Sequence, residues 1–259
     1  MKRLTALLLT LLLLLSVLPA QAAKSKSTPT PAPLEIQTEV IQEVPEQIQQ
    51  VLDQAYEELI AGDGLELKKR NKYTDWNGSH TGYGWCGGFI TWCMLQHDVP
   101  MQKKNDIKAG EVPGVVHVKE AGVGKLVTGY QKMYRTTMIP QKGFIAVFGN
   151  QMSKYGISGL YHVGLVYDVE KLSDTRYRIT TIEGNVSSPG YEDGHKKATH
   201  TIRMFVRDYD MSAEKKNNIT LVPEEERTRQ ESSIFSYQYT YNNKTLYINM
   251  FLMPWNPNE

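Results

Sequence analysis

A succession of strand patterns in the second half of the chain limits the folds that this sequence can adopt. "GFIAVFG" begins at residue 143, "YHVGLVYDVE" at 161 and "RYRITTIEGN" at 176. Each is rich in β-branched and aromatic residues, and turn-rich segments separate them. Because such strands follow one another closely, they are expected to pair antiparallel. Two later segments extend the pattern: "KKATHTIRMFVRDY" predicts a further strand, and "FSYQYTYNNKTLYINMFL" predicts a hairpin with its turn near Asn242 and Asn243.

Two helical patterns precede these strands. Apolar residues recur at helical spacing after Pro45, and "AGDG" then ends the pattern. A second apolar stripe runs through residues 86–97, with Cys86 in its first turn. Helices followed by an antiparallel strand run are typical of an α+β fold. Between them we expect an irregular segment over 98–118 and a short exposed helix within 124–137.

The N-terminus has the parts of a secretory signal peptide. Lys2 and Arg3 precede an apolar run that ends at Leu15, and the small residues of "LPAQAA" follow. This order predicts a signal peptide over 1–22 that is removed on export. A retained membrane anchor is the alternative, but it needs about 20 apolar residues and this run is shorter. The Pro-, Ser- and Lys-rich segment over 23–44 is expected to be a linker.

Charge and hydropathy exclude several classes of partner. The chain has 29 basic and 28 acidic residues, mixed along its length, for a net charge of +1. This balance gives no electrostatic reason to bind nucleic acid or an anionic membrane. No run after the signal peptide is apolar enough to span a bilayer. We therefore expect an exported protein without stable membrane insertion, and the sequence indicates no oligomeric state.

The two cysteines are predicted not to form a disulfide. If 86–97 is helical, the Cα atoms of Cys86 and Cys93 lie about 10 Å apart at ~1.5 Å rise per residue. A disulfide needs less than about 7 Å. Cys93 is expected to be core packing. Cys86 is either a small buried apolar residue or a reactive thiol, since a helix N-terminus favours a thiolate, and the two glycines after it would let a substrate approach.

A reactive thiol needs a base, and His162 is the best placed of the six histidines. It lies on the strand face opposite the apolar row, with Gly164 clearing space beside it. Glu183 and Asn185 end the next strand two residues apart, which predicts one shared face. Either could accept the Nδ1 proton of the imidazole and orient the ring. The alternatives are a structural histidine, a solvated carboxylate and a turn-forming asparagine.

Taken together, four motifs resemble those of a known family. "GWCGGFITWCM", "GFIAVFG", "YHVGLVYDV" and "TTIEGNVSS", in this order, are similar to the motifs of CHAP domains, the cysteine- and histidine-dependent amidohydrolases and peptidases. The resemblance covers roughly residues 45–206. It implies Cys86 as nucleophile, His162 as base, Glu183 as orienting group and Asn185 as an accessory polar residue. The chain departs from the family where Phe144 replaces an aspartate and Gly87 an alanine.

The resemblance also implies a fold and a function. The fold would be papain-like α+β, with N-terminal helices packed on an antiparallel sheet of about five to six strands. Residues 45–211 would form the catalytic domain, and 212–259 a C-terminal β-hairpin extension. The activity would be hydrolysis of an amide bond in peptidoglycan, by an N-acetylmuramoyl-L-alanine amidase or an endopeptidase. The sequence itself indicates no cofactor. The protein would be secreted and act at the cell wall.

Two questions stay open at this point. The second donor of the oxyanion hole could be any of three aromatic residues upstream of the cysteine, namely Tyr73, Trp76 and Tyr83. A secreted binding or scaffold protein that keeps the CHAP fold without turnover is the alternative function, because a fold alone does not guarantee activity.

Overall fold

The computed structural model describes most of the chain after the predicted leader. The predicted signal peptide, the linker as far as residue 38 and the hairpin turn at Asn242 and Asn243 lie outside the described residues. The described residues are 39–78, 82–110, 112–150, 159–188, 190, 194, 196–238, 240–241 and 244–259.

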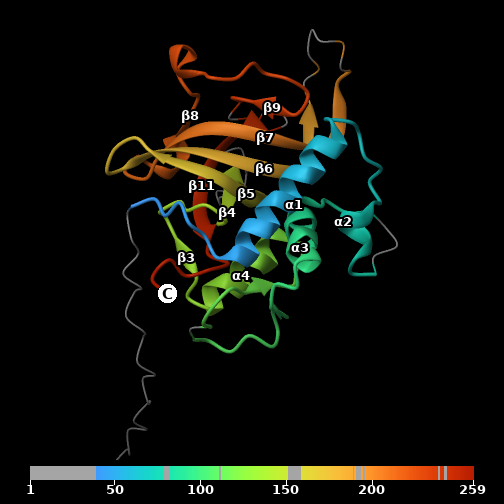
Figure 1. The fold of residues 1–259 in the computed structure, drawn as a ribbon, viewed down its shortest axis with the longest axis vertical. Coiled ribbons are helices and arrows are strands. Elements are labelled where there is room, and N and C mark those ends of the chain that lie inside the picture. Colours follow the sequence, from blue (N-terminus) through green and yellow to red (C-terminus); the bar gives the residue numbers. More distant parts are fainter. Residues whose placement is uncertain are drawn as a thin grey trace, which may run out of the picture. The chain divides into compact units, whose positions relative to one another are not determined.

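Four α-helices and two short 3-10 helices are present in the described residues (Figure 1). The apolar stripe predicted after Pro45 forms the buried face of α1, and Asp63 ends this helix in the left-handed conformation, with φ of 44°. The elements are α1 (Glu46–Gly62), α2 (Lys72–Asp75), α3 (Cys86–Gln96), α4 (Val123–Lys132), η1 (Lys215–Asn217) and η2 (Glu224–Glu226).

The described strands form one large sheet and one small one. The small sheet pairs β1 with β2 in parallel. The large sheet has nine strands, in the order β10-β11-β4-β5-β6-β7-β8, with β3 beside β11 and β9 beside β7. The strands are β1 (Met101–Gln102), β2 (His117–Val118), β3 (Thr136–Thr137), β4 (Ile145–Asn150), β5 (Gly159–Lys171), β6 (Arg176–Ser188), β7 (Ala198–Asp210), β8 (Ile219–Thr220), β9 (Phe235–Ser236), β10 (Thr240–Tyr241) and β11 (Lys244–Leu252).

The α+β class is confirmed, but the expected five to six strands were too few. All pairings in the large sheet are antiparallel except that of β7 with β9. β9 and β10 lie within the first arm of the predicted hairpin, and β10 pairs antiparallel with β11, as expected for its two arms. β3 and β8 were not predicted, because each has two residues and is too short to show alternation.

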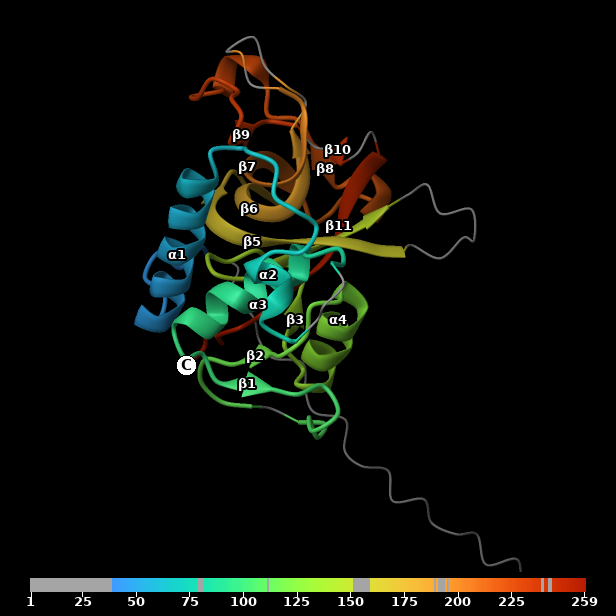
Figure 2. The same cartoon turned by 90° about the vertical axis from the view of Figure 1, so that its right-hand side faces the viewer.

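The helices α1 and α3 lie side by side against the sheet (Figures 1 and 2). α3 contacts β5 and β6, while α1 contacts β6 and β7. Gly184 of β6 permits this approach, because a Cβ at this position would lie 2.6 Å from Cζ3 of Trp85 and 2.7 Å from Cβ of Phe89. The first turn of α3 therefore lies directly over the middle of the sheet.

The C-terminal segment adds strands to the same sheet. β11 pairs antiparallel with β4, and its residues Leu246, Ile248 and Phe251 are buried. The sheet curls, since β8 contacts β11. Asn218 joins these two strands by bonding both the N–H and the carbonyl of Ile248, at 2.9 and 2.8 Å. The domain bounds drawn from the sequence remain a prediction.

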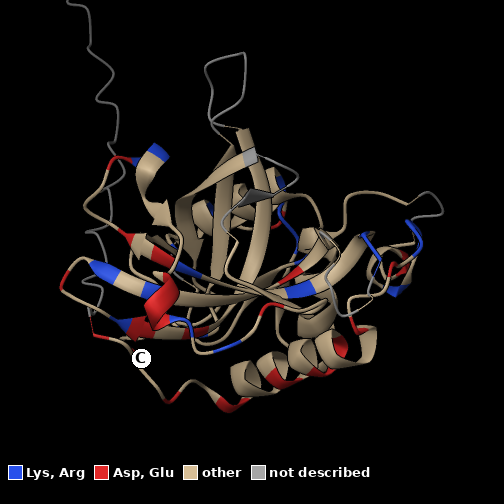
Figure 3. Ribbon diagram, turned by 90° about the horizontal axis from the view of Figure 1, so that it is seen from above, with Lys and Arg blue, Asp and Glu red and all other residues tan. Residues whose placement is uncertain are grey.

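Two regions differ from the expected local structure. The helix expected to be exposed is α4, which ends at Lys132 and buries Leu126, Val127 and Tyr130. The segment expected to be irregular contributes β1 and β2. Charged residues of both signs are interspersed over the described chain (Figure 3). No helix in this part of the chain is both long enough and apolar enough to cross a membrane.

Candidate active site

Cys86 is the first residue of α3 and is buried, with 7% of its surface exposed. Its sulfur is hydrogen-bonded to the side chain of His162 and accepts from the backbone N–H groups of Gly87 and Val163. Burial raises the pKa of the thiol, but the hydrogen bond and charge of His162 outweigh burial, so that the pKa of Cys86 lies below its ordinary value. The site therefore favours a thiolate.

His162 lies on β5, next to this sulfur. Its ring stacks on Phe148 of β4, with the ring centroids 5.8 Å apart. The Nε2 atom lies 2.9 Å from Oε2 of Glu183. The prediction that Nδ1 would face the carboxylate was therefore wrong. Since Nε2 already faces Glu183, Nδ1 is the nitrogen left for the thiol of Cys86.

The imidazole is stabilised in its charged form. Burial lowers the pKa of His162, but hydrogen bonds and charge interactions with Cys86 and Glu183 together raise it to about 9. The pKa values of the thiol and of the imidazole therefore shift in opposite directions. A thiolate–imidazolium pair follows from this, as in activated cysteine nucleophiles generally.

Glu183 is fully buried on β6, so the alternative of a solvated carboxylate is wrong. Its Oε1 accepts hydrogen bonds from Oγ1 of Thr181 and from Nη1 of Arg207, each at 2.6 Å. Burial raises the pKa of Glu183, but the charge of Arg207 and the hydrogen bond to His162 lower it to about 2. The carboxylate is therefore ionised.

Arg207 of β7 is a member of this cluster that the sequence argument missed. Its side chain is 1% exposed, and it lies across Phe148 and Phe205, with 5.0 and 4.5 Å from the guanidinium carbon to the ring centroids. The strand "TIRMFVRDYD" carried the only signal, because alternation places Arg203, Phe205 and Arg207 on one face. Charges of alternating sign thus run from the Cys86 thiolate to this guanidinium.

Gly164 makes room for the carboxylate. A Cβ at this position would lie 2.7 Å from Cγ and 3.2 Å from Cδ of Glu183. The space that this glycine leaves is therefore occupied by the side chain of Glu183, which in turn contacts His162.

Asn185 lies at an irregularity in the pairing of β6 with β7. The register shifts between Gly184 and Val186, and Asn185 adopts a left-handed conformation with φ of 63°. Regular alternation does not apply across this shift, so the shared face expected for Glu183 and Asn185 does not follow. Oδ1 of Asn185 lies 2.7 Å from Nδ1 of His200. The side chain thus has a histidine partner that the sequence argument did not assign.

The two glycines after the cysteine serve packing rather than the approach of a substrate. A Cβ at Gly87 would lie 2.4 Å from the carbonyl oxygen of Ala121, and one at Gly88 would lie 2.5 Å from that of Tyr73. Both positions therefore face other parts of the backbone. The expectation that these glycines let a substrate approach was therefore wrong, because Ala121 and Tyr73 pack on this part of the helix.

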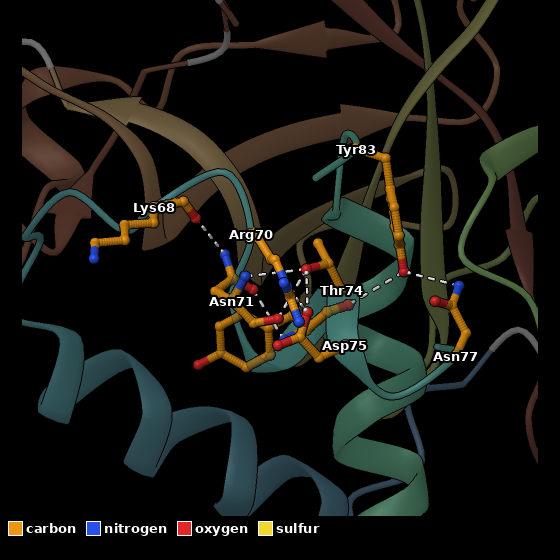
Figure 4. A network of polar contacts seen from close by, with 8 residues as sticks. Lys68, Arg70, Asn71, Thr74, Asp75, Asn77 and Tyr83 are labelled. Atoms are coloured by element: carbon orange, nitrogen blue, oxygen red, sulfur yellow. Dashed lines mark hydrogen bonds and ion pairs between the residues drawn. The ribbon is translucent and has the colours of Figure 1, made fainter. Parts of the chain in front are cut away.

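The three candidates for the second oxyanion donor differ in their bonding. The hydroxyl of Tyr73 donates to Glu58 of α1, and the indole N–H of Trp76 donates to the carbonyl of Tyr73, at 2.9 Å. The hydroxyl of Tyr83 accepts from Nδ2 of Asn77 at 3.1 Å (Figure 4). That hydroxyl also donates to the carbonyl of Tyr73, at 3.4 Å. Trp76 and Tyr83 both line a pocket beside α3.

The residues of this cluster lie largely within a segment that matches a known family. A family model for the CHAP domain matches residues 77–185, a range that includes Cys86, His162 and Glu183. The chain contains a CHAP domain. CHAP domains belong to the peptidoglycan hydrolases of the amidase and peptidase type, and peptidoglycan is the substrate that the family implies. No curated protein and no solved structure matched the chain.

The CHAP domain keeps both thiols free. Cys86 and Cys93 form no disulfide, as the helix spacing predicted, and Cys93 is fully buried in the core. Within the described ranges, no group of three or more His, Cys, Asp or Glu residues could hold a metal ion. Arg207 lies beyond the residues that the family model matches.

Proposed function

We propose that this protein is a secreted cell-wall hydrolase that cleaves an amide bond in peptidoglycan through Cys86, His162 and Glu183. The observation that carries the proposal is the buried series of contacts from the thiol through the imidazole to the carboxylate. The opposite pKa shifts of the first two groups support a thiolate nucleophile. The bond is either that between N-acetylmuramic acid and L-alanine or one within the stem or bridge peptides.

The chemistry proceeds in two halves. The thiolate of Cys86 attacks the amide carbonyl and forms a carbon–sulfur bond, while its backbone N–H at the start of α3 stabilises the oxyanion. His162 donates its proton to the leaving amine as the carbon–nitrogen bond breaks, and a thioester remains. The neutral imidazole then takes a proton from water, which attacks the thioester and releases the acid and the thiolate.

Glu183 and Arg207 support this cycle from behind the imidazole. The carboxylate orients the ring through Nε2 and stabilises the imidazolium, as the third group of a catalytic triad does. Arg207 is a positioning residue that keeps this buried carboxylate ionised, since an unpaired buried charge is strongly destabilised. Asn185 contacts His200, so we assign it a place at the rim of the site rather than the role of orienting the imidazole.

The decisive experiment uses purified peptidoglycan as substrate. We expect the mature protein to release soluble fragments, and mass spectrometry of their new termini to identify the bond. A free amine on L-alanine indicates an amidase, whereas a free amine on a stem or bridge residue indicates an endopeptidase. Intact peptidoglycan after incubation with the folded protein would contradict the proposal.

Labelling with iodoacetamide tests the nucleophile without a substrate. At neutral pH we expect rapid modification of Cys86 and almost none of Cys93. Equally slow modification of both thiols would favour the non-catalytic scaffold, because it would show that neither thiol is ionised.

A further inference from the structure

A pocket among the described residues lies beside the first turn of α3. It has a volume of about 760 Å³, within the range of small-molecule sites. Ala121 and Tyr83 both line it. Ala121 packs on Gly87, and the ring of Tyr83 lies 3.5 Å from where a Cβ on Gly88 would stand. The pocket walls therefore rest on the two residues that follow Cys86.

Hydrogen bonds fix residues in the lining of this pocket. On one side, Asn77 and the backbone of Tyr73 hold the hydroxyl of Tyr83 (Figure 4). On the other side, the hydroxyl of Thr91 donates to the carbonyl of Glu120 at 2.6 Å. Thr91 is fully buried. The lining is therefore held in place by hydrogen bonds to buried parts of the domain.

The lining has an excess of positive charge. It contains four lysines but only two acidic residues, Asp106 and Glu120. Glu120 pairs with one of them, Lys125, at 3.4 Å. Among the described residues, the other three lysines form no ion pair. These three are Lys103, Lys104 and Lys119.

We propose that this lysine-lined pocket is a subsite for the free carboxylates of the peptidoglycan stem peptide that flank the scissile amide. This inference rests on the proposed function and deepens it. An ammonium group binds a carboxylate as a compact point charge, and exposed pairs of this kind contribute modestly each. Trp76 and Tyr83 supply apolar surface beside these charges. The pocket would thus prefer acidic stem peptides to those whose carboxylates are amidated.

The test compares two soluble muropeptides that differ only in whether the stem carboxylates are free or amidated. We expect the wild type to cleave the acidic muropeptide with a kcat/KM about 3- to 10-fold higher. In the double variant Lys103→Gln, Lys119→Gln this ratio should fall toward one. Added salt should reduce the wild-type ratio as well, because it screens exposed charges.

A matched control removes the same amount of charge elsewhere. Lys108 and Lys216 are exposed lysines that do not line the pocket. The double variant Lys108→Gln, Lys216→Gln should therefore keep the wild-type ratio. If both double variants lowered the ratio equally, the effect would come from net charge, and the subsite would be excluded.

Binding separates failure of the subsite from failure of the proposed function. Calorimetry with Cys86→Ser and the two muropeptides measures the preference without turnover. If the wild type cleaves both muropeptides equally well, the hydrolase stands and the subsite is wrong. If it cleaves neither, the proposed function is wrong, and lysine-dependent binding of the acidic muropeptide alone would still support the subsite. Displacement by glycerol 3-phosphate as strong as by the acidic peptide would overturn the assignment to carboxylates.

Discussion

Cys86 and Cys93 lie on the same helix and are both buried, yet their thiols differ in acidity. The pKa of Cys86 is lowered, mainly because the effect of His162 exceeds that of burial. The pKa of Cys93 is raised well above its ordinary value, by burial first and then by the negative charge of Glu58. Burial alone therefore makes a thiol inert, and polar partners reverse its effect.

The position along α3 explains which thiol obtains those partners. Cys86 is in the first turn, where N–H groups have no partner within the helix, and its sulfur accepts from the N–H of Gly87. Cys93 lies two turns later and is packed in the hydrophobic core. The first turn also faces β5, which brings His162 to the sulfur. Substitutions at and around the two thiols test what causes this difference in acidity.

Removing one thiol at a time should give the largest contrast. We expect Cys86→Ser to lower kcat/KM on peptidoglycan by about 10,000-fold or more, since a serine hydroxyl does not ionise here. Cys93→Ser should retain most of the activity of the folded protein. Release of soluble fragments over time measures both. Reversed phenotypes would show that the nucleophile had been assigned to the wrong cysteine.

Removing the charge of Glu183, the partner of His162, should raise the pKa of Cys86 toward that of Cys93. Glu183→Gln keeps the shape but removes the charge, and we expect kcat to fall by about 10- to 1,000-fold. Without the carboxylate the imidazolium loses its proton at lower pH, and the thiolate is less stabilised, so the thiol ionises at higher pH. The acid limb of the rate profile should therefore move to higher pH and the alkaline limb to lower pH.

Profiles of kcat/KM against pH for wild type and Glu183→Gln, on a soluble muropeptide, measure both shifts, which together narrow the pH range of activity. Superimposable profiles would leave Cys86 and His162 as a dyad and exclude an orienting role for the carboxylate.

Arg207 should also influence the ionisation of Cys86, because it contacts Glu183, which contacts His162. In Arg207→Met the carboxylate of Glu183 loses a buried partner, which we expect to reduce the free energy of unfolding by about 3–5 kcal/mol. Labelling of Cys86 by iodoacetamide should also slow about 10-fold at neutral pH, because the imidazolium is less stabilised. Arg207→Lys should restore part of the labelling rate.

Arg203 of the same strand provides the control for this experiment. It is equally buried, but its guanidinium donates to the backbone carbonyls of Ser232 and Phe235. Arg203→Lys should lower stability without changing how labelling depends on pH. If Arg207→Lys and Arg203→Lys gave the same labelling profile, Arg207 would have only a structural role.

The smallest effect on turnover is expected at Cys93, where stability is the informative measurement. Cys93→Ser buries a hydroxyl in an apolar site, which we expect to cost about 1–3 kcal/mol. Thermal unfolding should show a lower Tm, while the labelling rate of Cys86 stays at the wild-type value. A Tm equal to that of the wild type would indicate that Cys93 is not packed in the core.

Part of the active site could be predicted from local patterns. Cys86 begins an apolar helix, and His162 and Glu183 lie in strongly patterned strands. The elements that carry these residues, and their order in the chain, could therefore be predicted. Arg207 could not be assigned in this way, because its partner Glu183 lies 24 residues earlier in the chain. A buried arginine in a strand is indistinguishable from an exposed one until the facing side chain is known.

Local sequence patterns predicted the order of the main helices and strands, the α+β class and the free thiols, because periodicity and spacing act over a few residues. These patterns could not predict which nitrogen of His162 faces Glu183, that Arg207 completes the charge series, or that β11 lies beside β4. Nor could they predict that protein backbone covers Gly87 and Gly88. These features are contacts between distant segments, and such contacts depend on packing and charge in three dimensions rather than on any local pattern.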